Sequence, residues 1–121
     1  RADAVLAIGS PGADRITSAM LQTLMPFLSG QLDIEAAIAA PRWHVEMALE
    51  ADAKDDKHRS ILHAAPGANF NANHLEVREH DTKNMFFGGV GAAGTVGEAG
   101  ELIAVADPRR IGGVTVEDRG R

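Results

Sequence analysis

The stretch AIGSPGADRIT, residues 7–17, passes from small residues into a helix-like pattern, and the interpretation of the whole chain starts from it. Ser10 is a favoured N-cap residue, and Pro11 suits the first position of a helix. The sequence therefore predicts a helix that begins within two residues of Gly12. Its first free backbone donors would be the N–H groups of Gly12 and Ala13, because proline has no N–H.

Free donors at a helix start can bind a negatively charged oxygen, and Gly12 has no side chain to block a close approach. A plainer interpretation explains the same residues. Ser10 could cap one of these N–H groups and leave an ordinary strand-to-helix turn. From these residues alone the plainer interpretation is favoured, because helix starts far outnumber anion sites.

The composition indicates one globular domain over residues 1–121. The net charge of −5 is spread along the chain without a basic stripe, which argues against a nucleic-acid partner. The absence of cysteine excludes disulfides, thiolate metal sites and a cysteine nucleophile. No apolar run approaches the roughly 20 residues of a membrane span. With no signal segment and no initiator Met, the sequence resembles an internal fragment, and its compartment is undetermined.

The first half of the chain predicts strand and helices. Residues 4–9, AVLAIG, fit a buried strand, and a helix follows it. Pro26 is expected to end or kink this helix, and Asp33 is expected to cap a second, shorter one. The first helix should pack on a sheet formed by residues 4–8 and 101–106. Its apolar stripe consists of Ile16, Met20 and Leu24.

The second half predicts strands and turns. Residues 42–50 alternate like a strand, and residues 51–59 form a charged run that is typical of a solvated loop. Residues 61–67 predict a short strand that ends in a turn. Residues 69–81 fit a helical turn, a strand or both in succession, and the pattern does not separate these.

Residues 84–96 and 101–107 flank a glycine-bearing turn and predict a β-hairpin. The segment GVGAAG, with Gly89, Gly91 and Gly94, matches a dinucleotide-binding fingerprint, and Asp107 lies near the distance expected for a ribose-binding acid. That fingerprint requires a helix to begin within it, whereas the sequence continues as TVGEAGE. We therefore expect a hairpin and no cofactor.

The remaining polar residues form no recognisable catalytic or metal-binding pattern. The five histidines lack paired metal-ligand spacing, so we expect scattered surface or strand residues and no metal site; they are His44, His58, His63, His74 and His80. Ser18 and Ser29 have no recognisable base partner.

Four ordered motifs, GSPGADRI, APRWH, MFFGGVGAAG and ADPRRIGG, resemble the C-terminal part of the small subunit of gamma-glutamyltransferases. The resemblance covers residues 4–113. It implies an α+β segment of an αββα N-terminal nucleophile hydrolase sandwich. Members of this family cleave themselves to free a threonine, which attacks a gamma-glutamyl amide and forms an acyl-enzyme. Water, an amino acid or a peptide then accepts the acyl group.

The resemblance also assigns roles to residues of this chain. The small residues of the family's GSPGG motif supply an oxyanion hole, which places that role on Gly12 and Ala13. Ala13 replaces the usual glycine and can present its N–H if its φ is negative. Arg42, Arg109 and Arg110 are interpreted as structural ion-pair or turn residues.

The nucleophile is expected outside this chain, because the family's threonine lies upstream of the motif. The chain alone should therefore be inactive. Its partners would be the large subunit, the start of the small subunit and a gamma-glutamyl substrate such as glutathione. Two alternatives stay open: a non-catalytic packing or interaction module, and a related amide hydrolase for a beta-lactam side chain or poly-gamma-glutamate.

Overall fold

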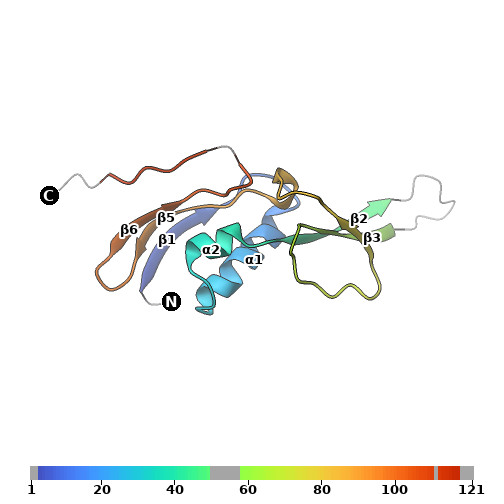
Figure 1. Ribbon diagram of the computed structural model, residues 1–121, viewed down its shortest axis with the longest axis horizontal. Helices are drawn as coiled ribbons and strands as arrows, with labels where there is room; N and C mark the ends of the chain where they lie inside the picture. The colour runs from blue at the N-terminus through green and yellow to red at the C-terminus, as the bar shows by residue number, and fades with distance from the viewer. Residues whose placement is uncertain (1–2, 50–57, 111, 118–121) are drawn as a thin grey trace.

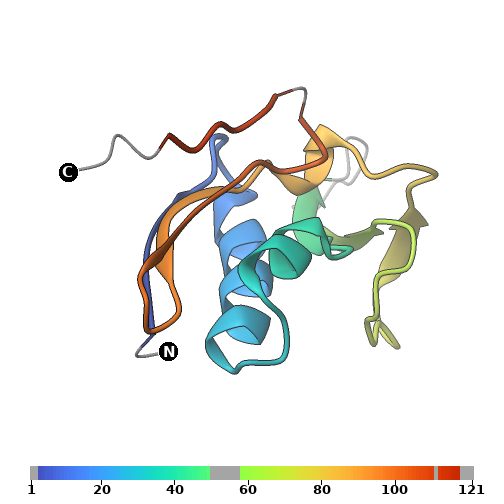
Figure 2. The ribbon, with the colours of Figure 1, turned by 60° about the vertical axis from the view of Figure 1, so that its left-hand side comes forward.

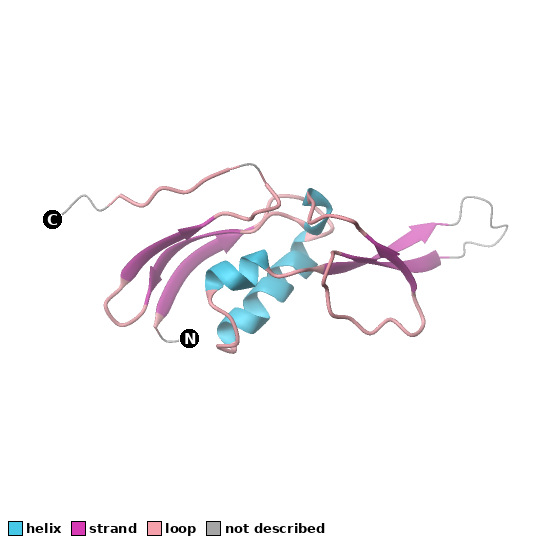
Figure 3. Ribbon diagram, viewed as in Figure 1, coloured by secondary structure: helices cyan, strands magenta, loops and turns pink. Residues whose placement is uncertain are grey.

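The computed structural model describes residues 3–49, 58–110 and 112–117 (Figure 1). Two three-stranded sheets lie at opposite ends of the molecule, and the helices lie between them (Figure 3). The strands are β1 (Ala4–Gly9), β2 (Trp43–Leu49), β3 (His58–Ala64), β4 (Glu76–Glu79), β5 (Gly91–Val96) and β6 (Glu101–Val105). The helices are α1 (Ile16–Leu28), α2 (Ile34–Ala39) and the 3-10 helix η1 (Met85–Phe87).

The first sheet has the order β1-β5-β6 and is antiparallel throughout. The predicted hairpin of β5 and β6 is confirmed, and the N–H of Gly100 closes its turn on the carbonyl of Gly97. β1 was expected to be buried, but only one of its faces is. Leu6 packs against the core, whereas Val5 is 76% exposed.

The helices cover one face of this sheet, and Figure 2 shows α1 and α2 on the same side of it. No element in the described ranges covers the other face, where Val5 and Leu102 are exposed. The core lies between the covered face and the helices, with Phe27, Ile38 and Val90 fully buried. The open face is therefore apolar surface that a further chain segment could cover.

The helix α1 packs on this sheet as predicted, with Met20 against the core. The buried side chains of α1 are Ala19, Thr23 and Phe27. They lie one position away from the predicted stripe of Ile16, Met20 and Leu24, because α1 faces α2 as well as the sheet.

The ends of both helices follow local chemistry. Pro26 does not end α1, as one form of its prediction had it, because α1 continues to Leu28 with the proline inside its last turn. Ser29 is its C-cap residue, and Gly30 follows with a φ of +76°, which is accessible to glycine. Asp33 caps α2 as predicted, and its side chain accepts the N–H of Ala36 at 2.7 Å. No helix in the described ranges combines the length and the apolar character that crossing a bilayer requires.

The second sheet has the order β2-β3-β4, with β2 and β3 antiparallel and β4 parallel to β3. The strands predicted within residues 42–50 and 61–67 are confirmed. Residues 69–75 contain no helix; a single turn, in which the N–H of Leu75 donates to the Ala72 carbonyl, precedes the strand β4. Of the predicted loop at residues 51–59, the last two residues belong to β3, and the others lie outside the described residues.

Candidate functional site

The turn between β1 and α1 differs from the predicted helix start. α1 begins at Ile16, with Arg15 as its N-cap residue, so a helix beginning within two residues of Gly12 is wrong. Gly12 has a φ of +135°, a conformation that no helix contains and that L residues rarely adopt. The turn is therefore a separate loop, and its N–H groups are not the first donors of a helix.

The contacts of Ser10 explain why the local pattern predicted the wrong helix start. Its Oγ contacts the carbonyl oxygen of Pro11 at 3.2 Å and accepts the N–H of Gly89 at 3.4 Å. A residue distant in sequence thus uses the predicted capping group. The interpretation in which Ser10 caps the N–H of Gly12 or Ala13 is also wrong.

The N–H groups of Gly12 and Ala13 find no hydrogen-bond acceptor in the described part of the chain. Both residues are exposed and line a cavity of about 280 Å³, whose other walls include Phe86 and Arg110. Ala13 has a negative φ, which is the condition for an alanine to present its N–H here. This arrangement offers two unused backbone donors to a ligand oxygen.

Two guanidinium groups accompany these donors. The Arg15 guanidinium lies 3.7 Å from the centre of the Phe86 ring, a cation–π contact at the cavity wall. Arg110 is exposed, and its side chain makes no ion pair within the described ranges. It lies so close to Gly89 that a Cβ atom there would be 2.9 Å from the Arg110 Cγ. Asp14 also lines the cavity, so its charge is mixed.

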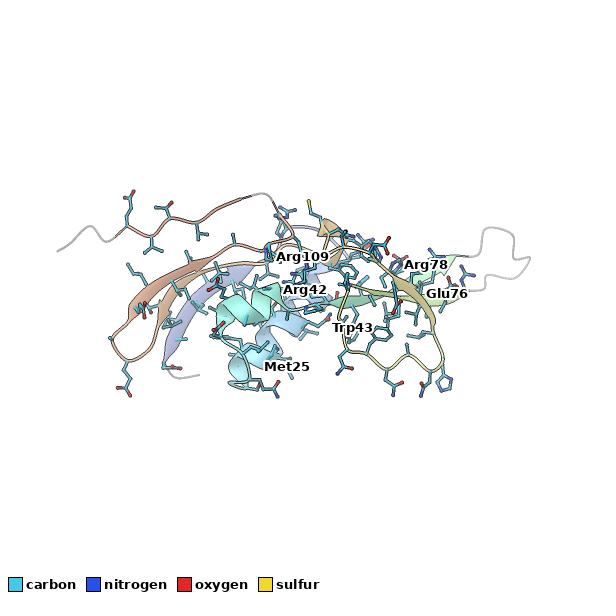
Figure 4. The ribbon with its side chains drawn as sticks, in the orientation of Figure 1. Met25, Arg42, Trp43, Glu76, Arg78 and Arg109 are labelled. Carbon is cyan, nitrogen blue, oxygen red and sulfur yellow. The ribbon has the colours of Figure 1, made fainter. Side chains whose placement is uncertain are left out.

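A second group of charges lies buried between the helices and the chain after β6. Arg42 Nη1 is 2.9 Å from Asp107 Oδ2, and Arg109 Nη1 is 3.0 Å from Asp107 Oδ1. Figure 4 shows Arg42 and Arg109 close together at the centre of the molecule. The two guanidinium groups also donate to the backbone carbonyls of Ile38, Ala40 and Phe87. The structural role predicted for Arg42 and Arg109 is confirmed.

Asp107 stays ionised in this buried cluster. Burial alone would raise the pKa of its carboxyl group, but the N–H groups of Val90 and Arg109 and the charge of Arg42 outweigh burial and lower that pKa. The N–H bonds measure 2.8 and 2.9 Å. Asp107 is therefore a structural anion. The segment GVGAAG runs into β5 and opens no helix, which confirms the hairpin interpretation.

His44 of β2 and His63 of β3 are strand residues, as expected, but with His80, which directly follows β4, they gather in one place and are not scattered. His63 Nδ1 lies 3.0 Å from His80 Nε2, and His63 Nε2 lies 2.8 Å from Glu46 Oε1. His44 is the cross-strand neighbour of His63. His44 and Glu46 are two positions apart in one strand, so the sequence could have predicted that they share a face. His63 and His80 join them only through the pairing of strands. Within the described ranges no group of three His, Cys, Asp or Glu is arranged to hold a metal ion.

Ser18 has a histidine partner that the sequence did not predict. Its Oγ lies 2.8 Å from His44 Nδ1 and also donates to the Arg15 carbonyl at 3.2 Å. A hydroxyl has one proton, so a serine that donates to this carbonyl must accept from His44, which then cannot act as its base. Burial, followed by the charge of Arg15, lowers the pKa of His44. The pair lines an apolar groove of about 580 Å³ and does not form an activated nucleophile.

Comparisons with known proteins identify the family. The sequence matches the family model described as Gamma-glutamyltranspeptidase over residues 1–117. The chain belongs to the gamma-glutamyltranspeptidase family. This confirms the resemblance read from the sequence motifs. No curated protein matches the chain significantly.

Solved structures show the same fold. The transpeptidase CapD of Bacillus anthracis is 19% identical, with a TM-score of 0.67, and the match covers 97% of this chain and 66% of that chain. The gamma-glutamyltranspeptidase of Pseudomonas nitroreducens complexed with L-DON is 23% identical, with a TM-score of 0.61, and the match covers 93% and 55%. That of Helicobacter pylori, as the T380A mutant, is 21% identical, with a TM-score of 0.56, and the match covers 87% and 54%.

These neighbours are N-terminal nucleophile hydrolases, so the predicted fold class, an α+β segment of that fold, is confirmed. The chain spans about half to two-thirds of the length of the solved structures that it matches. The comparisons therefore describe a part of such a protein.

Proposed function

We propose that this chain is the C-terminal part of the small subunit of a gamma-glutamyl transferase or hydrolase, and that the N–H groups of Gly12 and Ala13 form its oxyanion hole. The observation that carries the proposal is that both donors lack an acceptor in the described ranges and line one cavity. Family membership supplies the reaction class. The substrate class we assign is glutathione-like gamma-glutamyl amides.

In the reaction, a threonine hydroxyl outside this chain attacks the gamma-carbonyl carbon, and the carbonyl oxygen becomes an oxyanion. Gly12 and Ala13 donate their N–H groups to that oxygen. The C–N bond then breaks, the amine leaves with a proton, and the acyl group stays on the threonine. Water or an amine attacks this acyl-enzyme through a second oxyanion held by the same donors. Preorganised donors of this kind accelerate turnover by about 100- to 1000-fold each.

The charges at the cavity suit this chemistry. The guanidinium groups of Arg15 and Arg110 place positive charge near the two N–H groups, which favours a developing oxyanion, and the single carboxylate of Asp14 at the same cavity opposes only part of it. Gly12 lets the backbone approach the reacting carbon without a side chain in the way.

The rest of the protein is the partner in this proposal. Residues 1–121 would form one domain of the small subunit, and the open face of the β1-β5-β6 sheet would pack against the remaining polypeptide. Val5 and Leu102 are exposed on that face in the described chain. The large subunit and the start of the small subunit would supply the nucleophile and hold the glutamyl group.

The test replaces Ala13 by lactic acid in the full-length protein, which exchanges the N–H for an ester oxygen and keeps the methyl group. We expect hydrolysis of a chromogenic gamma-glutamyl amide to slow by about 100- to 1000-fold, or about 3 to 4 kcal/mol, with the thermal midpoint changed little. Gly12→Pro is unsuitable, because proline cannot adopt the φ of +135° found at Gly12.

Two controls accompany this substitution. Ala13→Gly keeps the N–H and should stay within several-fold of the parent, since it changes backbone propensity by up to about 1 kcal/mol. The isolated chain is the negative control and should show no turnover. A folded ester variant with near-parental turnover would reject the oxyanion hole and favour a packing role for this turn.

A further inference from the structure

A run of hydrogen bonds behind the cavity wall joins η1 to the second sheet. The Asn84 Oδ1 atom accepts the N–H of Phe86 at 2.9 Å, which fixes the orientation of the Asn84 amide. The amide nitrogen therefore faces His80 Nδ1, at 3.2 Å. Because an amide nitrogen can only donate, His80 Nδ1 must be an unprotonated acceptor.

The direction of the remaining bonds follows from this one. A neutral His80 carries its proton on Nε2 and donates it to His63 Nδ1 at 3.0 Å. His63 in turn carries its proton on Nε2 and donates it to Glu46 Oε1 at 2.8 Å. The chain of donors thus runs from Asn84 through His80 and His63 to Glu46, and both rings are neutral Nε2–H tautomers.

This series of hydrogen bonds ends at the cavity wall. Glu46 Oε2 lies 3.8 Å from Arg15 Nη2, and Arg15 stacks on Phe86. The Phe86 ring also contacts the rings of His63 and His80, with centroid distances of 4.4 and 4.8 Å. Arg15 and Phe86 both line the cavity that contains the unused donors. The histidines therefore touch the wall directly through Phe86 and indirectly through Glu46.

We propose that this series of hydrogen-bonded histidines positions Arg15 and Phe86 at the cavity, and that protonation of His80 releases them. A proton on His80 Nδ1 would face the amide donor of Asn84. It replaces a hydrogen bond by two opposed donors. The catalytic consequence rests on the proposed function, whereas the tautomers and the coupling to Arg15 do not.

The surroundings support a neutral His80 ring. Burial, followed by His63, lowers the pKa of His80, and the neighbouring Asp81 opposes that shift. The other charged or titratable groups around the pair are Glu46 and His44 from β2, Arg15 from the loop before α1, and Arg78 of β4, which is in register with His63. For His80, Asp81 favours protonation and Arg15 disfavours it.

The test uses the full-length protein labelled with ¹⁵N in histidine and arginine. We expect the His63 and His80 rings to show the Nε2–H tautomer near neutral pH. On acidification the His80 imidazole signals and the Arg15 side-chain signal should shift together. His80→Gln keeps one donor and one acceptor but removes a titrating group, so the shared transition and the acid limb of kcat/KM should move to lower pH.

His74→Gln is the matched control, because His74 is exposed and contacts none of these residues, and it should leave both readouts unchanged. If His80→Gln fails to fold, Glu46→Gln provides the second variant, and there the Arg15 signal should no longer follow the imidazoles. Nδ1–H tautomers at His63 or His80 would overturn the proposal. So would an Arg15 signal that stays constant while the histidine signal changes with pH. A protein without gamma-glutamyl turnover would reject the proposed function, while the spectra would still decide this inference.

Discussion

Two polar regions adjoin η1: the buried cluster of Arg42, Asp107 and Arg109, and the exposed turn at Gly12 and Ala13. They differ in whether their polar groups have hydrogen-bond partners within the described residues. In the cluster, charges and backbone groups pair with one another at 2.6 to 3.0 Å. In the turn, two backbone donors lack an acceptor within the described chain. The paired groups of the cluster stabilise the fold, although Arg42 Nε and Arg109 Nε are buried there without a hydrogen-bond partner. The exposed N–H groups of the turn can be solvated by water and can bind a ligand oxygen.

This difference separates arginines that look alike in sequence. Arg109 and Arg110 are neighbours, yet only Arg109 enters the buried cluster. Arg110 lines the cavity beside the free donors. Of these two adjacent arginines, Arg109 therefore stabilises the fold, and Arg110 lies at the candidate site.

The largest effect on stability should come from removing the anion of the cluster. Asp107→Ala leaves two buried guanidinium groups without their carboxylate and should lower the free energy of unfolding by about 3 to 5 kcal/mol. Chemical denaturation of the full-length protein measures this loss.

Glu76→Gln is the control for this substitution, because Glu76 pairs with Arg59 and Arg78 at the surface. Figure 4 labels Glu76 and Arg78 in the second sheet, away from the cluster. Such exposed pairs contribute about 0 to 1 kcal/mol. Equal effects of the two substitutions would contradict the contrast between buried and exposed charges.

A smaller effect is expected from Gly12→Ala. The variant keeps the N–H but forces alanine into a φ of +135°, at a cost of about 1 to 3 kcal/mol. A Cβ atom at this position would contact only the Ile16 side chain, at 3.7 Å, so backbone strain and not crowding causes the loss. Thermal unfolding beside Ala13→Gly measures it. An unchanged midpoint would show that the turn relaxes without cost.

The smallest effect concerns pH. The pKa of His44 is lowered by burial and by Arg15, so the unfolded chain takes up a proton first as the pH falls below 6.5. Folding stability should therefore decline below that pH, and Glu46, whose pKa the His63 hydrogen bond lowers, adds a loss below 4.5. His44→Gln should flatten the decline between about pH 7 and about pH 5.5 in thermal unfolding. A decline identical to that of the parent would exclude His44 as its source.

Local patterns predicted most of the elements. Alternation identified β2, and the side chain of Asp33 identified the start of α2. The glycine-bearing turn identified the β5-β6 hairpin. Each of these rests on residues that contact one another within a few positions. Pro26 does not end α1, which continues for two more residues.

The candidate site was predicted in part. Gly12 and Ala13 were named from the sequence, but for the wrong local reason, since Gly89 and not the helix engages Ser10. The histidine chain was missed, because His63 and His80 meet only after β3 and β4 pair. Contacts made by pairing across the sheet are absent from any single window of sequence.

The order of strands in the first sheet has a kinetic consequence. Within the described residues β1 lies at the sheet edge and pairs with β5, so Leu6 meets Gly94 far along the chain. The hairpin of β5 and β6 can form locally in microseconds, whereas the β1-β5 pairing requires a long loop to close. During synthesis β1 therefore leaves the ribosome well before β5, the strand with which it pairs. Non-local closure of this kind slows folding and lengthens the time for which the apolar side chains of β1 are open to chaperones.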